Sequence, residues 1–94
     1  MFTVHIEHTV GSFDEWKRMF DSDPLNRKGS GVTAFRVMRL VDDPASVRVD
    51  LELASRPEAD AMKAALEQLW AGPASAMLRN PVARVSETVE AETL

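Results

Sequence analysis

Hydrophobic and polar residues alternate strictly in two short stretches of the chain. Over residues 2–10, FTVHIEHTV, the even-numbered side chains are apolar except for His8, and the odd-numbered side chains are polar. Residues 47–53, VRVDLEL, repeat the pattern with valine and leucine at the odd positions. A period of two is typical of a strand with one buried face, so both stretches predict half-buried β-strands. The valine-rich residues 32–41 and 82–89 predict two further strands.

Two other segments have the spacing of amphipathic helices. Ser12 with Glu15, and again Ser55 with Glu58, form capping-box patterns, in which the serine oxygen accepts an amide of the first helical turn. Apolar side chains then recur every three or four residues behind each cap. We therefore expect a helix after each serine, the first ending near residue 23 and the second at Gly72.

The two halves of the chain repeat one pattern, because residues 2–41 and 46–89 each contain a strand, a capped helix and a second strand. The aspartates and proline of DDPAS, residues 42–46, predict a turn that joins the halves through a hairpin. This β-α-β-β-α-β order predicts one ferredoxin-like domain of class α+β over residues 1–94. Its four-stranded antiparallel sheet should have the first and third strands at the centre and both helices on one face.

Composition and charge exclude several classes of function. The chain has 94 residues, a formal net charge of −4 and no cysteine. Without a cluster of lysine and arginine we expect no nucleic-acid partner, because binding to phosphates needs cations. The lack of cysteine excludes disulfides and thiolate metal sites. We find no membrane span and no secretion signal, and so expect a cytoplasmic protein without a membrane partner.

Three segments and the order of elements resemble the dimeric α/β-barrel superfamily, in particular small proteins similar to antibiotic-biosynthesis monooxygenases. The segments are the opening HTVGSFDEWKRMFDS, the second strand GVTAFRVMRLVDDP and the passage VDLELAS into the second helix. The resemblance implies a homodimer whose sheets pack face to face. It also implies a cavity, which in this superfamily serves cofactor-free oxygenation of quinols, haem degradation, lactone isomerisation or no known reaction.

The sheet face turned away from the helices is expected to be polar. The first and third strands give it the charged or titratable residues His5, Glu7, Arg48, Asp50 and Glu52. One register that agrees with the internal repeat places Glu7 against Asp50, and another places His5 against Asp50 and Glu7 against Arg48. We expect the second, because it avoids two adjacent carboxylates. His8 points to the other face and should pack beneath the helices or near a strand end, with a satisfied ring nitrogen.

One interpretation makes this polar face an active site. Asp50 would orient the imidazole of His5 as a general base that removes a proton from an enolisable or phenolic molecule. An arginine would hold an anionic oxygen of the substrate, and the candidates are Arg48, Arg36 and Arg39. The further candidates for contact with a ligand are Glu7 and Glu52. The protein would then be a cofactor-independent monooxygenase or isomerase.

Two other interpretations stay open. The same charges form a ladder that fixes strand register and dimer geometry in a structural or ligand-binding homodimer without turnover. Alternatively, His5, Glu7 and Asp50 hold a metal, although one histidine without a spacing signature is weak support. We therefore expect no cofactor and no metal, and a small molecule as the ligand.

Overall fold

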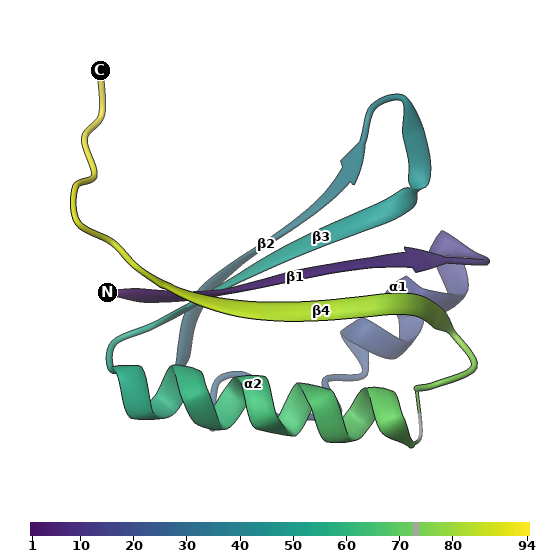
Figure 1. Cartoon of the computed structure of the whole chain (residues 1–94), viewed down its shortest axis with the longest axis horizontal. Coiled ribbons are helices and arrows are strands. Elements are labelled where there is room, and N and C mark those ends of the chain that lie inside the picture. Colours follow the sequence, from purple (N-terminus) through teal and green to yellow (C-terminus); the bar gives the residue numbers. More distant parts are fainter. Residues whose placement is uncertain (73) are drawn as a thin grey trace.

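The computed structural model describes residues 1–72 and 74–94. Its elements in chain order are β1 (Phe2–Val10), α1 (Phe13–Asp21), β2 (Val32–Leu40), β3 (Asp43–Leu53), α2 (Arg56–Ala71) and β4 (Leu78–Glu87). The strands form one antiparallel sheet in the order β2-β3-β1-β4, and both helices lie on one side of it (Figure 1). The element order, the central β1–β3 pair and the helix layer confirm the predicted ferredoxin-like fold.

β1 and β3 pair in the predicted register, which places residues of opposite charge next to each other. His5 lies opposite Asp50, and Glu7 lies opposite Arg48. This register turns the apolar rows of both strands toward the helices, where they are buried; the largest fully buried side chains are Leu51, Leu53, Val4, Val47 and Val49. The core therefore occupies the single layer between sheet and helices.

Both predicted helix caps are present. The Ser12 hydroxyl oxygen accepts the amide of Glu15 at 3.2 Å, and the Ser55 oxygen accepts the amide of Glu58 at 3.3 Å. At the second cap the Ser55 hydroxyl also donates to the Glu58 carboxylate at 2.8 Å. Each cap satisfies an amide that the first turn leaves without a partner. Among the described residues, no helix is long and apolar enough to cross a membrane.

Three predicted boundaries are wrong. The first helix ends at Asp21, not near residue 23. The β2–β3 turn is shorter than residues 42–46, because β3 already begins at Asp43 and pairs there with β2. The last strand covers Leu78–Glu87 and not 82–89. It includes Asn80 and Pro81, residues typical of turns, which the strand accommodates in a bulge with Asn80 at a φ of 53°.

Gly31 is the glycine whose conformation and surroundings both exclude a side chain. Its φ is +99°, and a Cβ atom there would overlap the carboxylate of Glu58, which belongs to the second helix cap. We expect Gly31→Ala to lower the free energy of unfolding by about 1–3 kcal/mol, measured by urea denaturation. Gly11→Ala is the control, because its Cβ would meet nothing within 4 Å. Equal effects of the two substitutions would contradict this explanation.

Candidate functional site

The polar face brings together the residues that the sequence placed on it. The His5 Nδ1 atom lies 2.8 Å from Asp50 Oδ1, and Arg48 forms an ion pair with Glu7. The second ring nitrogen of His5, Nε2, lies 2.6 Å from the Ser86 hydroxyl oxygen. Ser86 was not predicted, because its place depends on the pairing of β4 with β1, which no sequence pattern indicated. Both nitrogens of the His5 ring therefore have partners.

The two candidate arginines of β2 lie on opposite faces of the sheet. Arg36 pairs with Asp50 in the ladder and belongs to the polar face. Arg39 pairs with Val47, whose row faces the helices, and its guanidinium carbon lies 4.3 Å from the centre of the Phe13 ring. Arg39 is thus separated from His5 by the sheet.

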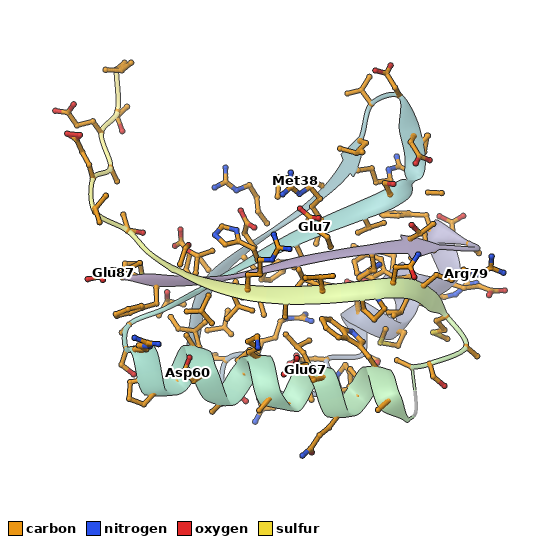
Figure 2. The ribbon with its side chains drawn as sticks, in the orientation of Figure 1. Glu7, Met38, Asp60, Glu67, Arg79 and Glu87 are labelled. Atoms are coloured by element: carbon orange, nitrogen blue, oxygen red, sulfur yellow. The ribbon has the colours of Figure 1, made fainter. Side chains whose placement is uncertain are left out.

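The polar face is shallow and also carries apolar groups. His5, Glu7 and Arg48 line a depression together with Val82 and Arg84 of β4. Glu7 and Met38 project from the sheet on the side away from α2 (Figure 2). Within residues 1–72 and 74–94, no group of three or more His, Cys, Asp or Glu side chains is arranged to hold a metal ion. The geometry of this face therefore offers ion pairs and a partly open depression.

A second, mainly apolar cavity lies on the other side of the sheet. A cavity of about 50 Å³ is bounded by the apolar faces of β1, β3 and both helices. The sheet contributes Ile6, Val49 and Leu51 to its wall, and α2 contributes Met62, Leu66, Leu69 and Trp70. Such a volume holds a few water molecules, so a ring-bearing ligand requires part of the wall to move. An apolar cavity with few polar groups is the usual form of a small-molecule site.

His8 is the polar residue that the sheet contributes to this cavity, whose lining also includes Asp23 and Arg27. Its side chain is buried among the lining residues, and its ring centre lies 5.1 Å from that of Trp16. The expected packing beneath the helices is present, but one ring nitrogen, Nδ1, is buried without a hydrogen-bond partner among the described residues. Burial lowers the pKa of His8 from 6.5 to about 4, so the imidazole is neutral at neutral pH. A neutral imidazole nitrogen can accept a hydrogen bond from a ligand O–H.

The two histidines therefore define two different candidate sites. The sequence pattern separated them correctly by strand alternation, but it favoured His5 because Asp50 and Arg48 were its neighbours. The buried nitrogen of His8 without a partner was not predicted, since a histidine in an apolar row is usually a packed residue. The signal that could have found it is the internal repeat, because its equivalent in the second half is the fully apolar Leu51.

Comparison with models of known protein families and with curated protein sequences finds no match. Solved structures do match in fold. SnoaB, a cofactor-independent oxygenase from Streptomyces nogalater, has a TM-score of 0.74 at 16% identity, with 96% of this chain and 94% of that chain covered. An antibiotic biosynthesis monooxygenase has a TM-score of 0.70 at 13% identity, with 96% and 100% covered. A dimeric ferredoxin-like protein from an uncultured marine organism has a TM-score of 0.66 at 15% identity, with 97% of each chain covered.

These similarities confirm the resemblance stated from the sequence. The chain has the ferredoxin-like fold of proteins related to antibiotic-biosynthesis monooxygenases, and the match extends over nearly its whole length. At these identities the comparison establishes the fold, while activity depends on the residues of the site.

The buried neutral His8 should make the stability of the protein depend on pH. The unfolded chain binds a proton at this residue near pH 6.5, but the folded protein does so only near pH 4, because burial lowers the pKa of His8. The stabilisation is therefore fully present above pH 6.5 and is lost as the pH falls toward 4. Between pH 7 and pH 5 the free energy of unfolding should decrease by about 2 kcal/mol through His8 alone.

Urea denaturation at the two pH values measures this effect. His8→Leu should remove that part of the pH dependence, because leucine does not titrate. His5→Gln should retain it, since His8 is then unchanged. The explanation is contradicted if His8→Leu and the wild type lose equal stability between pH 7 and pH 5.

Proposed function

We propose that the protein binds a phenolic or enolisable small molecule in the cavity between sheet and helices, and that it acts on this ligand as a cofactor-independent monooxygenase or isomerase. The proposal depends on one observation at His8. Its buried Nδ1 atom lacks a partner among the described residues, in a cavity whose other walls are almost entirely apolar. A ligand hydroxyl would supply the hydrogen bond that is missing.

The walls of the cavity suit a flat, mainly apolar ligand. The rings of Trp16 and Phe20 are stacked with centres 5.2 Å apart and an interplanar angle of 28°, and both line the cavity. Aromatic side chains pack well against ligand rings. A phenol bound there would donate its O–H to His8 and leave its rings against these side chains.

The proposed oxygenation can be written as a balanced reaction of the substrate with O₂ alone, without a cofactor. In a test case, 1-naphthol and O₂ give naphthoquinone and water: one oxygen atom forms a C=O bond at the ring carbon opposite the hydroxyl, and the other leaves as water. His8 would accept the hydroxyl proton as the ring becomes electron-rich, which is the role of a general base. The similarity in fold to SnoaB, a cofactor-independent oxygenase, supports this reaction class.

A second candidate function uses the polar face, and its support is the 2.8 Å contact between His5 and Asp50. Asp50 would orient His5 as the base, with Arg48 holding an anionic oxygen, and a second copy would close the site. Further ligand contacts would come from Glu7, Glu52 and Arg36. Arg39 contributes to neither arrangement on this face, because it lies on the helix side. Without turnover, the same contacts would fix strand register and dimer geometry.

We expect 1-naphthol to bind wild-type protein and to shift the indole N–H resonances of Trp16 and Trp70 in a ¹⁵N–¹H correlation spectrum. His8→Leu should weaken this binding about 3- to 10-fold, because one hydrogen bond is lost. It should leave the binding of 1-methoxynaphthalene, which has no hydroxyl, unchanged. His5→Gln is the matched control and should alter neither affinity. If neither compound shifts the indole resonances, the proposal of a ligand site in this cavity fails.

His5→Gln also separates the two candidate sites in an activity assay. With naphthalene diols as substrates and oxygen uptake as the readout, catalysis in the cavity predicts a wild-type rate for this variant. Catalysis on the polar face predicts loss of turnover at an unchanged melting temperature, because glutamine keeps a hydrogen-bonding group but cannot act as the base. A wild-type rate therefore excludes the catalytic role of His5.

We further propose that the protein is a homodimer that pairs through the polar sheet face, as the similarity to a dimeric ferredoxin-like protein supports. Val82 lies in the central depression of this face and is 41% exposed in the single chain. Val82→Glu should weaken the dimer, because a longer, charged side chain would have to be desolvated between the two faces. Sedimentation equilibrium at micromolar concentration measures the change. Ala61→Glu, on the exposed side of α2, should remain dimeric, and a wild-type monomer would contradict the proposal.

A further inference from the structure

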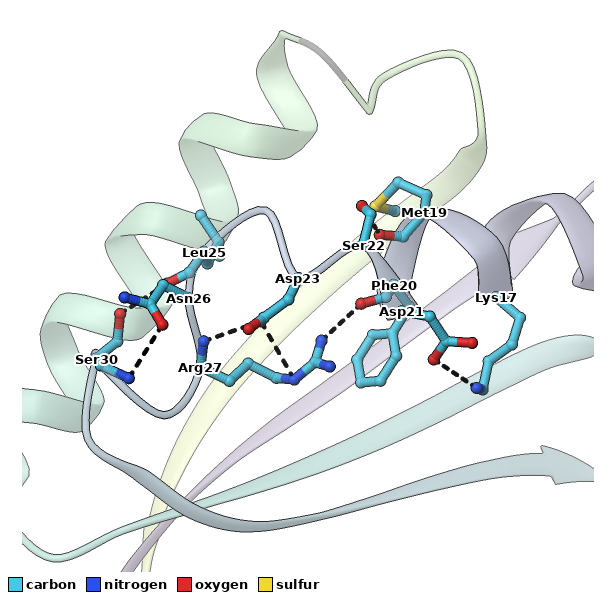
Figure 3. A network of polar contacts seen from close by, with 11 residues as sticks. Lys17, Met19, Phe20, Asp21, Ser22, Asp23, Leu25, Asn26, Arg27 and Ser30 are labelled. Atoms are coloured by element: carbon cyan, nitrogen blue, oxygen red, sulfur yellow. Dashed lines mark hydrogen bonds and ion pairs between the residues drawn. The ribbon is translucent and has the colours of Figure 1, made fainter.

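Arg27 holds together the segment that connects α1 with β2. Its guanidinium carbon lies 3.9 Å from the centre of the Phe20 ring and 4.9 Å from the centre of the Phe35 ring. Its Nη1 atom donates to the Phe20 carbonyl oxygen at 2.8 Å, and its Nε atom lies 3.5 Å from a carboxylate oxygen of Asp23. Figure 3 shows the polar contacts of Arg27 with the Phe20 carbonyl oxygen and with Asp23. The cation is therefore held between the end of α1, the connection and β2.

The same residue forms the boundary between the closed cavity and the outside. Asp23 and Arg27 line the cavity beneath the sheet, and both also line an open hollow on the surface, next to Lys28 and Phe35. The Arg27 side chain is only 16% exposed. The ion pair between Arg27 and Asp23 therefore lies in the wall that the cavity and the hollow share.

Two residues of the segment have a left-handed backbone conformation. Asp23 has a φ of 57° and Asn26 a φ of 48°, which aspartate and asparagine adopt at a smaller cost than other side chains. The Asp23 carboxylate supports this conformation by accepting the amide of Arg27 at 2.9 Å. Left-handed conformations of this kind are common in segments that change conformation around a ligand. The cavity of about 50 Å³ needs such a movable wall before a ring-bearing ligand can enter.

We propose that Arg27 is the anion-recognition residue of this cavity, and that the carboxylate of an aromatic acid replaces Asp23 as its ion-pair partner. This inference rests on the proposed function, and it adds that the ligand is acidic. Arginine stays charged at any physiological pH, and its fork of N–H groups matches the two oxygens of a carboxylate. The present contacts use Nε and one N–H of Nη1 out of five donors, so donors remain for a ligand.

Asp23 is suited to being displaced. Its side chain is 37% exposed, and its distance of 3.5 Å from Nε is long for a charge-assisted hydrogen bond. A ligand carboxylate that approaches from the cavity side would meet a guanidinium already desolvated by two aromatic rings. Because an ion pair is stronger where water is excluded, the ligand would compete well with Asp23.

A pair of nearly isosteric ligands tests the proposal. Wild-type protein should bind 1-naphthoate more tightly than the uncharged 1-naphthamide, as measured by the indole resonances of Trp16 and Trp70. Arg27→Met keeps an apolar chain over Phe20 and should weaken the binding of naphthoate about tenfold, without changing that of naphthamide. Asp23→Asn removes the competing charge, keeps an oxygen for the Arg27 amide and tolerates the left-handed φ. It should tighten the binding of naphthoate severalfold.

The pair Lys63 and Glu67 on α2 provides the matched controls, because it has the same spacing of four residues and lies outside the cavity lining. Lys63→Met changes the net charge as Arg27→Met does, and Glu67→Gln changes it as Asp23→Asn does. Neither control should alter the affinity for 1-naphthoate or for 1-naphthamide. Equal binding of both ligands to all variants overturns the role of Arg27 but leaves ligand binding in the cavity intact. The role of Arg27 is also overturned if 1-naphthol binds but neither 1-naphthoate nor 1-naphthamide does. Failure of every ligand, 1-naphthol included, overturns the proposed function itself. If Arg27→Met does not fold, Asp23→Asn decides the question alone.

Discussion

The register between the two central strands determines nearly everything else in this protein. Successive side chains of a strand point to opposite faces, so a shift of one residue would exchange the buried row for the polar one. With His5 opposite Asp50, both strands turn valine and leucine toward the helices and their charges away from them. The same register sends His8 to the cavity and His5 to the outer face. His5 and His8, three positions apart in the sequence, thus lie in two separate environments.

These environments place opposite demands on an imidazole. On the outer face, His5 has a carboxylate and a hydroxyl as partners and remains accessible to solvent. Beneath the sheet, the apolar surroundings of His8 disfavour the charged ring and hold its pKa near 4. A polar group in such a place is costly unless something bonds to it. That cost distinguishes the cavity from the outer face as the place where a ligand gains most from binding.

The sequence predicted the fold well because its local patterns agree with one another. Strand alternation, two serine caps and opposite charges on neighbouring strands all favoured the same topology and the same central register. The face of β2 could not be predicted, because an irregularity between Val32 and Ala34 changes which of its side chains face the helices. The start of β4 was missed for a similar reason, since Asn80 and Pro81 look like a turn. The cavity and the role of Arg27 depend on packing between distant segments, for which no local pattern exists.

The bulge in β4 has a consequence for how copies of this chain can associate. β4 is an outer strand of the sheet, and an unpaired outer strand is a template for the addition of further strands and for aggregation. Pro81 has no amide hydrogen to offer a new strand, and the irregularity at Asn80 bends the backbone away from a straight ladder. Growth by edge-to-edge strand addition is therefore opposed along this side, which leaves the sheet face free for the association proposed above.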